Sequence, residues 1–196
     1  MELPPIVQTG AAVLRAHATE LTPAQLATAE IQALIATMIE VMRDAPGVGL
    51  AAPQIGIPLR VIVLEERAEV VSTLTEDELR EKERVAFATR TIVNPVLRML
   101  GETRAMFFEG CLSVHGYAAL VERHHEVEVT GLDEHGSPIH WQVSGWPARI
   151  LQHEVDHLDG TLYIDRMQTR TFSTVAHVRD RFAGRTIAQI RAELGV

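Results

Sequence analysis

The sequence predicts an α+β domain, and three patterns carry that prediction. Apolar residues recur at helical spacing over residues 26–43 and again over 145–158, whereas polar and apolar residues alternate over 125–143. The alternating stretch surrounds Asp133-Glu134-His135-Gly136, which is typical of the turn in a β-hairpin. The 196 residues, 46% of them hydrophobic, suit one domain with one core. We therefore expect a single domain over residues 1–196.

The first predicted helix spans residues 26–43 and stops at Pro46-Gly47, a pair that cannot continue a helix. Residues 47–56 are small and rich in glycine, which predicts an ordered loop. The β-branched residues of 60–64 follow this loop and predict a strand.

The middle of the chain is predicted to be mostly antiparallel sheet. Residues 65–90 are dense in charge, so we expect a solvated loop with one helical turn rather than an interaction surface. Residues 91–95 then form a strand that ends in a turn, and residues 125–132 and 139–143 form the two strands of the hairpin.

The second predicted helix can be capped by Ser144, contains Pro147 in its first turn and ends near Gly160. Its apolar positions fall on two stripes, and the first of them leads to two histidines: Trp146, Ile150, His153 and His157, then Leu151, Val155 and Leu158. Two such stripes predict a helix that is buried on most sides.

Composition excludes several classes of function. The formal net charge of −8 provides no positive field that would gather DNA. No apolar stretch approaches the roughly 18 residues that a membrane span needs. The first residues lack the features of a secretory signal or a transit peptide, so we expect a cytoplasmic protein, or an organellar one only if a transit peptide has been removed. The single cysteine, Cys111, excludes an intrachain disulfide and fits a reducing compartment.

The second helix carries the sequence His153-Glu154-Val155-Asp156-His157, an HExxH pattern. Imidazoles four residues apart lie about 6 Å apart along the axis on one face, where both can bind one metal ion. Glu154 can reach a water molecule at that metal, as metal-assisted hydrolysis requires. The alternative is a pair of buried histidines that hydrogen-bond to neighbours. Burial among apolar residues is costly without a strong partner, which favours the metal.

A catalytic metal site usually has three protein ligands and one open position, so a third donor is needed. After His157 no histidine or glutamate follows at the spacing of zinc proteases, since the next are His177 and Glu193. Upstream, Cys111 follows Gly110, a residue that lets backbone approach closely. A lone cysteine is more often a core residue, so the residues alone leave its role open.

Three segments of the sequence resemble the signature motifs of peptide deformylases. The motif G-x-G-x-A-A-P-Q corresponds to residues 47–54, E-G-C-L/E-S to 109–113, and Q-H-E-x-D-H-L to 152–158. Their order and separation agree with the family, and the resemblance extends to about Met167. It implies a fold in which mixed and antiparallel sheets pack around a central metal-binding helix.

The resemblance also implies a metal centre. Cys111, His153 and His157 would hold one divalent ion, with Fe²⁺ expected in the cell and Zn²⁺, Ni²⁺ or Co²⁺ in the isolated protein.

The implied reaction removes the N-formyl group from the N-terminal methionine of nascent polypeptides and releases formate. Glu154 would be the general base and then the general acid. The Gln54 side-chain amide and the Leu112 backbone N–H would donate to the oxyanion. Two alternatives are a zinc endopeptidase, which the missing downstream ligand disfavours, and an inactive relative that only binds peptide N-termini.

The substrate backbone would lie like an added strand along Val48, Gly49 and Gly110. A pocket for the methionine side chain is expected from apolar residues near the motifs, for which an ordinary core role is the alternative: Val48, Phe107, Trp146 and Ile150.

Three further features are predicted outside the motifs. Glu109 and Arg123 pair as a brace for Cys111, with two unrelated surface charges as the alternative. His115 is expected to be a partly exposed loop histidine. Residues 168–196 form a basic, helical segment that packs on its own domain, and contact with ribosomal RNA phosphates is the alternative.

Overall fold

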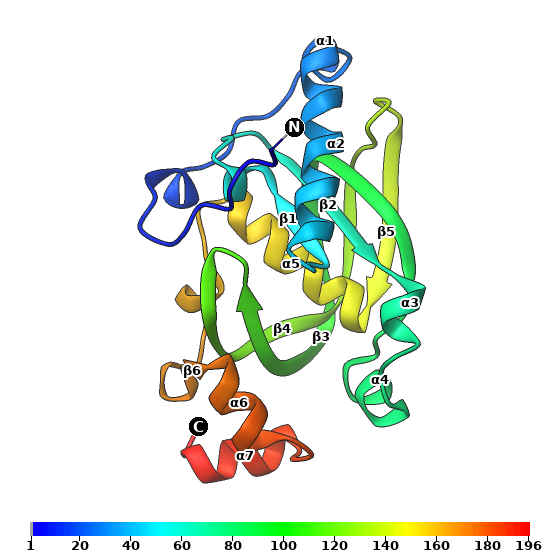
Figure 1. The fold of residues 1–196 in the computed structure, drawn as a ribbon. Helices are drawn as coiled ribbons and strands as arrows, with labels where there is room; N and C mark the ends of the chain where they lie inside the picture. The colour runs from blue at the N-terminus through cyan, green and yellow to red at the C-terminus, as the bar shows by residue number, and fades with distance from the viewer. Residues whose placement is uncertain (1) are drawn as a thin grey trace.

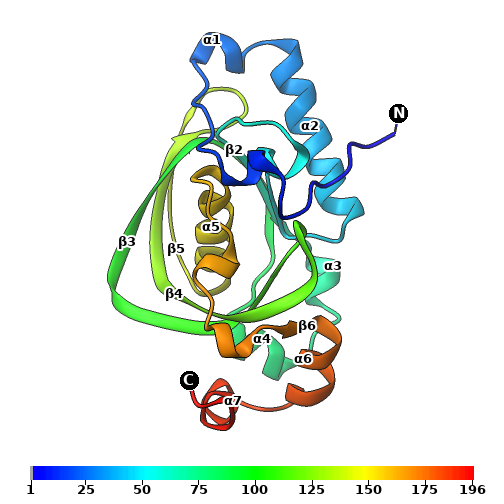
Figure 2. The same cartoon turned by 90° about the vertical axis from the view of Figure 1, so that its left-hand side faces the viewer.

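The computed structural model describes residues 2–196, apart from the side chains of residues 77 and 78. A six-stranded sheet curves around one long helix (Figures 1 and 2). The strands are β1 (Gly49–Ala51), β2 (Val61–Glu66), β3 (Phe87–Cys111), β4 (Val114–Leu132), β5 (Pro138–Ser144) and β6 (Ser173–Thr174). They are ordered β1-β2-β3-β4-β5, with β6 on β4, and every strand pairing in this sheet is antiparallel. A parallel contact occurs at the isolated bridge between Thr19 and Leu59. The predicted α+β class is confirmed.

The helices lie at both ends of the sheet and in its centre. They are α1 (Pro23–Leu26), α2 (Ala29–Asp44), α3 (Ala68–Val71), α4 (Glu76–Lys82), α5 (Gly145–Leu158), α6 (Val175–Phe182) and α7 (Ile187–Leu194). The predicted first helix begins later than expected because Thr28 caps α2, its hydroxyl accepting a hydrogen bond from the Ile31 N–H at 3.4 Å. Within the part of the chain that the structure describes, no helix is long and apolar enough to cross a membrane.

Three local predictions were wrong. Residues 47–56 form the short strand β1 and a 3₁₀ turn, Ala52–Ile55, instead of a loop. Residues 65–90 contain both α3 and α4. The strand at 91–95 does not end at Asn94, because β3 continues through a bulge there. The Asn94 amide stabilises this bulge by exchanging hydrogen bonds of 2.8 and 2.9 Å with the backbone of Leu21.

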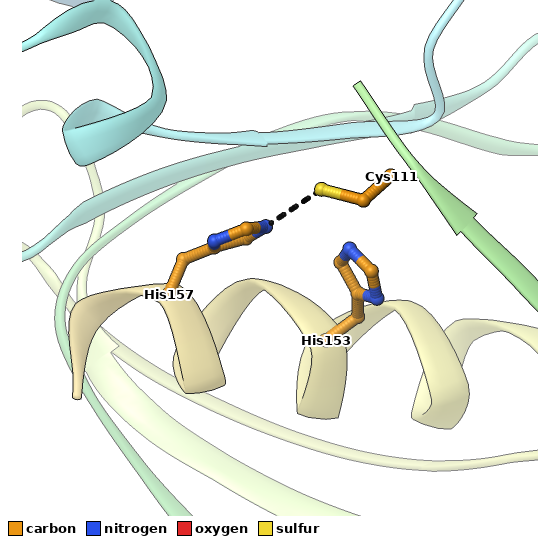
Figure 3. A group of neighbouring side chains, drawn as sticks. All are labelled: Cys111, His153 and His157. Atoms are coloured by element: carbon orange, nitrogen blue, oxygen red, sulfur yellow. Dashed lines mark hydrogen bonds between the residues drawn. The ribbon is translucent and has the colours of Figure 1, made fainter. Parts of the chain in front are cut away.

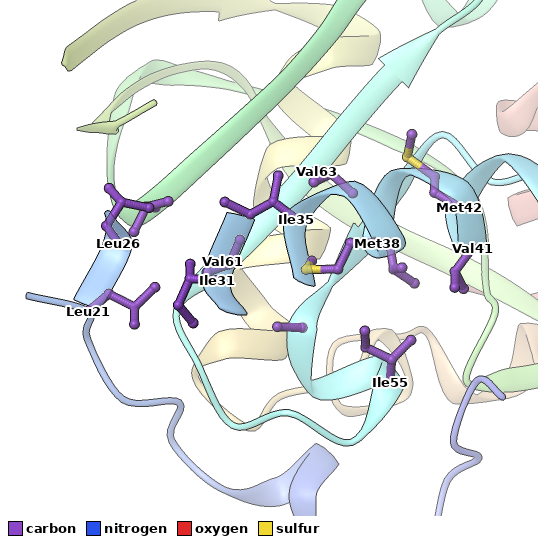
Figure 4. Close-up of a cluster of buried hydrophobic side chains, with 13 residues drawn as sticks. Leu21, Leu26, Ile31, Ile35, Met38, Val41, Met42, Ile55, Val61 and Val63 are labelled. Carbon is purple, nitrogen blue, oxygen red and sulfur yellow. The ribbon is translucent and has the colours of Figure 1, made fainter. Parts of the chain in front are cut away.

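Strand β2 is buried on both faces, which explains its continuous apolar sequence. Val61 and Val63 face α2 and pack in the cluster drawn in Figure 4. Ile62 and Leu64, the alternating positions, face α5 instead. The sheet is therefore covered by α2 on its outside and filled by α5 on its inside.

Helix α5 lies within the curve of the sheet (Figure 2) and is buried along most of its length, as predicted. It follows Ser144, although the Ser144 side chain makes no capping hydrogen bond. At its C-terminal end Gly160 has φ +71°, and a Cβ atom there would lie 2.7 Å from the Arg15 carbonyl oxygen. Only glycine satisfies both conditions, so the N-terminal segment packs closely on the end of α5.

The C-terminal segment forms α6 and α7, which pack on the domain. Phe182 and Ile190 are buried against Leu120 of β4, and the Phe182 ring stacks on Phe108 of β3 at a centroid distance of 5.6 Å. This arrangement agrees with the predicted packing of residues 168–196 on their own domain.

Candidate metal and catalytic site

A thiol and two imidazoles converge beside α5 (Figure 3). His153 and His157 project from one face of the helix, and Cys111 is the last residue of β3. The ligand atoms of these three residues all lie within 4.8 Å of one another, and the Cys111 Sγ lies 3.3 Å from the His157 Nε2. His115 is exposed and lies outside this cluster. The structure therefore brings the three predicted ligands together.

The tight turn between β3 and β4 places the thiol. Cys111 pairs with Val114, so only two residues separate the strands. The Ser113 N–H donates to the Cys111 Sγ at 3.4 Å, and the Gln54 Nε2 lies 3.6 Å from the same sulfur. These two contacts fix the position of the sulfur atom beside α5.

The donor set fits a transition-metal cation. One thiolate and two imidazoles suit such ions. Burial lowers the pKa of His157 and keeps its imidazole neutral, the form that coordinates metal. Burial also acts to lower the pKa of His153, but hydrogen bonds to Cys111 and Glu109 outweigh it and raise that pKa well above its usual value. Positive charge is thus favoured between Cys111 and Glu109, and a metal ion would supply it.

Glu109 connects the imidazole of His153 to two buried arginines. Its Oε2 lies 3.1 Å from the His153 Nδ1, and it accepts hydrogen bonds from Arg123 at 2.9 and 3.1 Å and from Arg149 at 2.6 Å. Burial would raise the pKa of Glu109, but its hydrogen bond with His153 and the charge of Arg123 hold it far below its usual range. The predicted pair of Glu109 and Arg123 is present, but it contacts His153 rather than Cys111, because the carboxylate points towards α5.

Arg149 was missed by the sequence analysis. It precedes His153 by one helical turn, is 5% exposed, and also donates to the carbonyl oxygens of Ala105 and Val121. A charged residue on an otherwise buried helix was the available signal, because such a residue needs partners. Arg149 therefore ties α5 to both β3 and β4 beside the metal-ligand cluster.

Glu154 lies next to the cluster in a desolvated position. It is 4% exposed, and burial raises its pKa to about 7. Among the described residues, its Oε2 has no hydrogen-bond partner. Gly49 lies directly against this carboxylate: a Cβ atom on Gly49 would be 2.8 Å from the Glu154 Cδ. A side chain at residue 49 would therefore displace the Glu154 carboxylate.

The side-chain amide of Gln54 is held in one orientation. Its Oε1 accepts a hydrogen bond from the Ala51 N–H at 2.9 Å, so its Nε2 faces Ser113 and Cys111. Gln54 is 1% exposed and lies in the 3₁₀ turn after β1. Gln54 and Leu112 both line a cavity beside the metal-ligand cluster.

A cavity of about 380 Å³ opens beside Cys111, His153 and Glu154. Most of the predicted substrate-binding residues line it: Val48, Gly49, Gly110, Trp146 and Ile150. Phe107 is not among its lining residues, and Phe108 is, because successive side chains of a strand point to opposite faces. The ring of Phe107 instead lies 4.8 Å from the Arg149 guanidinium.

Trp146 is fixed in the cavity wall by two charged residues. Its indole Nε1 donates to the Glu66 Oε2 at 2.7 Å, and Arg84 donates to the same oxygen at 2.9 Å. The Arg84 guanidinium also lies 4.8 Å from the centre of the Trp146 ring. The charged segment 65–90 is thus not only a solvated loop, since it supplies Arg84 to the wall of the cavity.

Comparisons with known proteins agree with this architecture. The sequence profile of the polypeptide deformylase family matches residues 3–173. The chain is 53% identical over 176 residues to the chloroplastic peptide deformylase 1A of Solanum lycopersicum, covering 90% of this chain and 64% of that protein. It is 45% identical over 192 residues to peptide deformylase 1 of Streptomyces coelicolor, covering 97% and 85%. The chain thus spans less than two thirds of the length of the tomato relative.

The fold is also similar to solved structures. A Met-Ala-Ser-bound crystal structure of a class I type b peptide deformylase from Acinetobacter baumannii superimposes with a TM-score of 0.75 at 31% identity. The match covers 85% of this chain and 99% of that one. The similarity therefore extends over most of this chain and nearly all of the Acinetobacter chain.

Proposed function

The chain belongs to the polypeptide deformylase family, and from this premise we propose that it removes the formyl group from the N-terminal methionine of newly made polypeptides, releasing formate. The observation that carries the proposal is the convergence of Cys111, His153 and His157 beside a cavity that also exposes Glu154. A hydrolase needs these parts together: a metal centre, a proton carrier and space for the substrate.

Cys111, His153 and His157 hold one divalent metal ion in this proposal, Fe²⁺ in the cell and Zn²⁺, Ni²⁺ or Co²⁺ in the isolated protein. Such an ion would act as a Lewis acid, and it would lower the pKa of a water molecule that it binds from about 15.7 towards 7. Metal analysis after anaerobic purification, together with activity before and after exposure to air, tests the identity of the ion. The thiol of Cys111 must stay reduced, which supports a reducing compartment such as the cytoplasm.

Glu154 carries the proton in the proposed reaction. It takes a proton from the water that attacks the formyl carbon, and it returns a proton to the departing methionine nitrogen. Its buried Oε2, which has no hydrogen-bond partner among the residues that the structure describes, and its pKa of about 7 support this role. A group that titrates near neutrality can both accept and release a proton.

Gln54 and Leu112 stabilise the negative charge on the formyl oxygen. The Gln54 side-chain amide is oriented before the substrate arrives, because its Oε1 accepts a hydrogen bond from the Ala51 N–H. The Leu112 backbone N–H is the second donor. A fixed donor of this kind contributes about 3 kcal/mol to transition-state stabilisation.

The substrate backbone is proposed to add to β1, an edge strand whose neighbour in the sheet is β2. Val48 and Gly49 line the cavity on this side, and Gly110 lines it on the other. Among the described residues, a Cβ atom at Gly110 would meet only the Tyr117 carbonyl oxygen, at 3.4 Å. Trp146, Ile150 and Phe108 are proposed to hold the methionine side chain, with Phe108 in place of Phe107; Val48 completes the pocket.

A three-substrate assay tests the proposal. The metal-loaded protein is incubated with a formyl-Met peptide, the matching acetyl-Met peptide and a longer peptide with an internal cleavage site. Formate release from the first peptide alone is the expected result. Internal cleavage would indicate a zinc endopeptidase, and binding without turnover would indicate an inactive relative.

Ribosome contact by residues 168–196 remains a prediction. Two of its arginines, Arg181 and Arg185, pair with Glu193 in the same segment, which lowers the charge available to RNA phosphates. Co-sedimentation with ribosomes at low and high salt tests the contact, since phosphate contacts weaken as salt rises.

A further inference from the structure

A second cavity, of about 480 Å³, lies against α5. Residues of the helix and its C-terminal end line it at spacings of three and four, which places them on one face: Gln152, Val155, Asp156 and Asp159. The first cavity is lined by other residues of the helix, such as His153 and Glu154, and the two cavities share no lining residue among those described. Small-molecule sites have volumes of about 300–1,000 Å³. The second cavity is therefore a separate space, large enough for a small ligand.

The second cavity opens where β3 separates from β2. In the described sheet, β2 pairs with β3 only as far as Val93, whereas β3 continues beside β4 to Cys111. Leu97 and Met99 lie on β3 beyond this point and share one face of the strand by alternation. Both line the cavity together with Val155 of α5, and Met99 is 44% exposed. These side chains give the cavity an apolar wall that solvent reaches.

Charged side chains also line the second cavity. Four are arginines and three are carboxylates: Arg60, Arg104, Arg123 and Arg166, then Glu122, Asp156 and Asp159. Asp156 accepts hydrogen bonds from Arg123 and Arg166. Asp159 accepts one from Arg60. The lining thus carries one net positive charge, although the whole chain has a formal net charge of −8. An anion is favoured here over a cation.

Two polar groups in this lining lack partners. Arg104 and His124 lie directly opposite each other in the pairing of β3 with β4. Within the described part of the chain, the Arg104 guanidinium forms no hydrogen bond or ion pair, and the buried His124 Nδ1 has no hydrogen-bond partner. A guanidinium presents its N–H groups as a planar fork that fits a carboxylate. Arg104 is thus the group best suited to hold an anion in the second cavity.

We propose that the second cavity binds a small organic anion that joins a carboxylate to an apolar group. The carboxylate lies at Arg104, and the apolar group lies against Leu97 and Met99, because contact there removes apolar area from water. The inference goes beyond the proposed function, since it adds a ligand site that the reaction does not use. It also stands or falls independently of deformylation.

Calorimetry of the zinc-loaded protein with three probes tests both halves of the proposed ligand. Benzoate has the charge and the apolar ring, benzamide has the ring without the charge, and acetate has the charge without the ring. Benzoate is expected to bind about tenfold more tightly than either of the others, as one charge-assisted contact or one buried ring supplies. Equal affinities for the three probes would overturn the proposal, and so would the absence of benzoate binding at millimolar concentration.

Two variants locate the site. Arg104→Gln is expected to lower the affinity for benzoate about five- to tenfold and to leave benzamide unaffected. Met99→Gln is expected to weaken benzoate binding and to leave acetate unaffected. Both side chains are exposed, so circular dichroism should show that the variants fold like the wild-type protein. The matched control is Arg98→Gln, because Arg98 is an exposed arginine of the same strand that does not line the cavity.

The position of bound benzoate separates this cavity from the metal-ligand cluster, which can itself bind a carboxylate. In NMR spectra of the zinc-loaded protein, benzoate is expected to shift the backbone amide signals of residues 97–99 and 122–124. Shifts confined to residues 47–49 and 110–112 would place benzoate in the first cavity and overturn the proposal. Unchanged benzoate affinity in Arg104→Gln, or an equal loss in Arg98→Gln, would also refute it.

Discussion

The Nδ1 atom of His153 lies 3.1 Å from the Oε2 atom of Glu109, so β3 helps to orient an imidazole that α5 carries. Arg123 and Arg149 in turn hold the carboxylate from two sides. Because Nδ1 faces Glu109, the other nitrogen of the ring is left to face Cys111 (Figure 3). A carboxylate in this position fixes the orientation of a metal-binding histidine and makes it a stronger ligand.

Glu109→Gln is expected to weaken metal binding by about 10- to 100-fold, because the amide cannot replace the charge that orients His153. Competition with a chromophoric chelator measures the affinity. Glutamine is preferred to alanine, because its amide oxygen can still accept hydrogen bonds from Arg123 and Arg149. Glu128→Gln, which alters a surface pair with Arg98, is the control and keeps the wild-type affinity. Unchanged affinity in Glu109→Gln would contradict the role of Glu109.

Glu154→Ala and Cys111→Ala are expected to separate proton transfer from metal binding. Glu154→Ala retains the metal and loses about 10²- to 10⁴-fold in turnover, as removal of a general base does. Cys111→Ala loses both the metal and the activity, because a ligand is missing. Elemental analysis and formate release measure the two properties. A fully active Cys111→Ala would contradict the ligand assignment.

Gly49→Ala is expected to lower turnover while the protein remains folded and loaded with metal. The new methyl group would lie 2.8 Å from the Glu154 Cδ, so the carboxylate must move. We expect a loss in kcat approaching that of Glu154→Ala, with circular dichroism and metal content unchanged. Wild-type kcat in Gly49→Ala would show that Glu154 tolerates displacement.

Arg84→Ala is expected to loosen Trp146 in the cavity wall. Loss of the cation–π contact and of the shared Glu66 contact should raise KM for formyl-Met peptides about two- to fivefold, with kcat little changed. Trp141 and Trp146 are the two tryptophans of the chain, so emission in a Trp141→Phe background reports Trp146 alone. Arg90→Ala is the matched control, because Arg90 lies over the Trp141 ring instead. Equal shifts of the emission in Arg84→Ala and Arg90→Ala would refute the specific contact between Arg84 and Trp146.

Asp165→Asn is expected to make the free energy of unfolding depend less on pH in the acid range. Burial acts to raise the pKa of Asp165, but hydrogen bonds from the Arg15 side chain and the Leu162 N–H outweigh it and lower that pKa below 3.8. The charged form therefore stabilises the fold above pH 3.8, and this contribution disappears as the pH falls through the lowered value. The wild-type protein and Asp165→Asn are unfolded with urea at pH values from 7 to 2.5. The urea concentrations at their unfolding midpoints should converge as the pH falls. A difference that stays constant with pH would contradict the prediction.

The sequence by itself determined the features that depend on neighbours along the chain. Two histidines four residues apart share a helical face whatever surrounds the helix, and the alternation around Asp133-Glu134-His135-Gly136 specifies a hairpin. The resemblance to deformylase motifs added Cys111 to the histidines, which no local pattern could do.

Only the tertiary structure decided which distant side chains meet. Arg149 shares Glu109 with Arg123, Arg84 reaches Trp146 from the charged segment, and Val175 reaches the cavity from the C-terminal segment. Strand register also decided that Phe108, and not Phe107, lines the cavity. The physical reason is that a one-residue change in register exchanges the two faces of a strand. Register and long-range packing depend on all the contacts of the sheet together, whereas a local pattern records only periodicity.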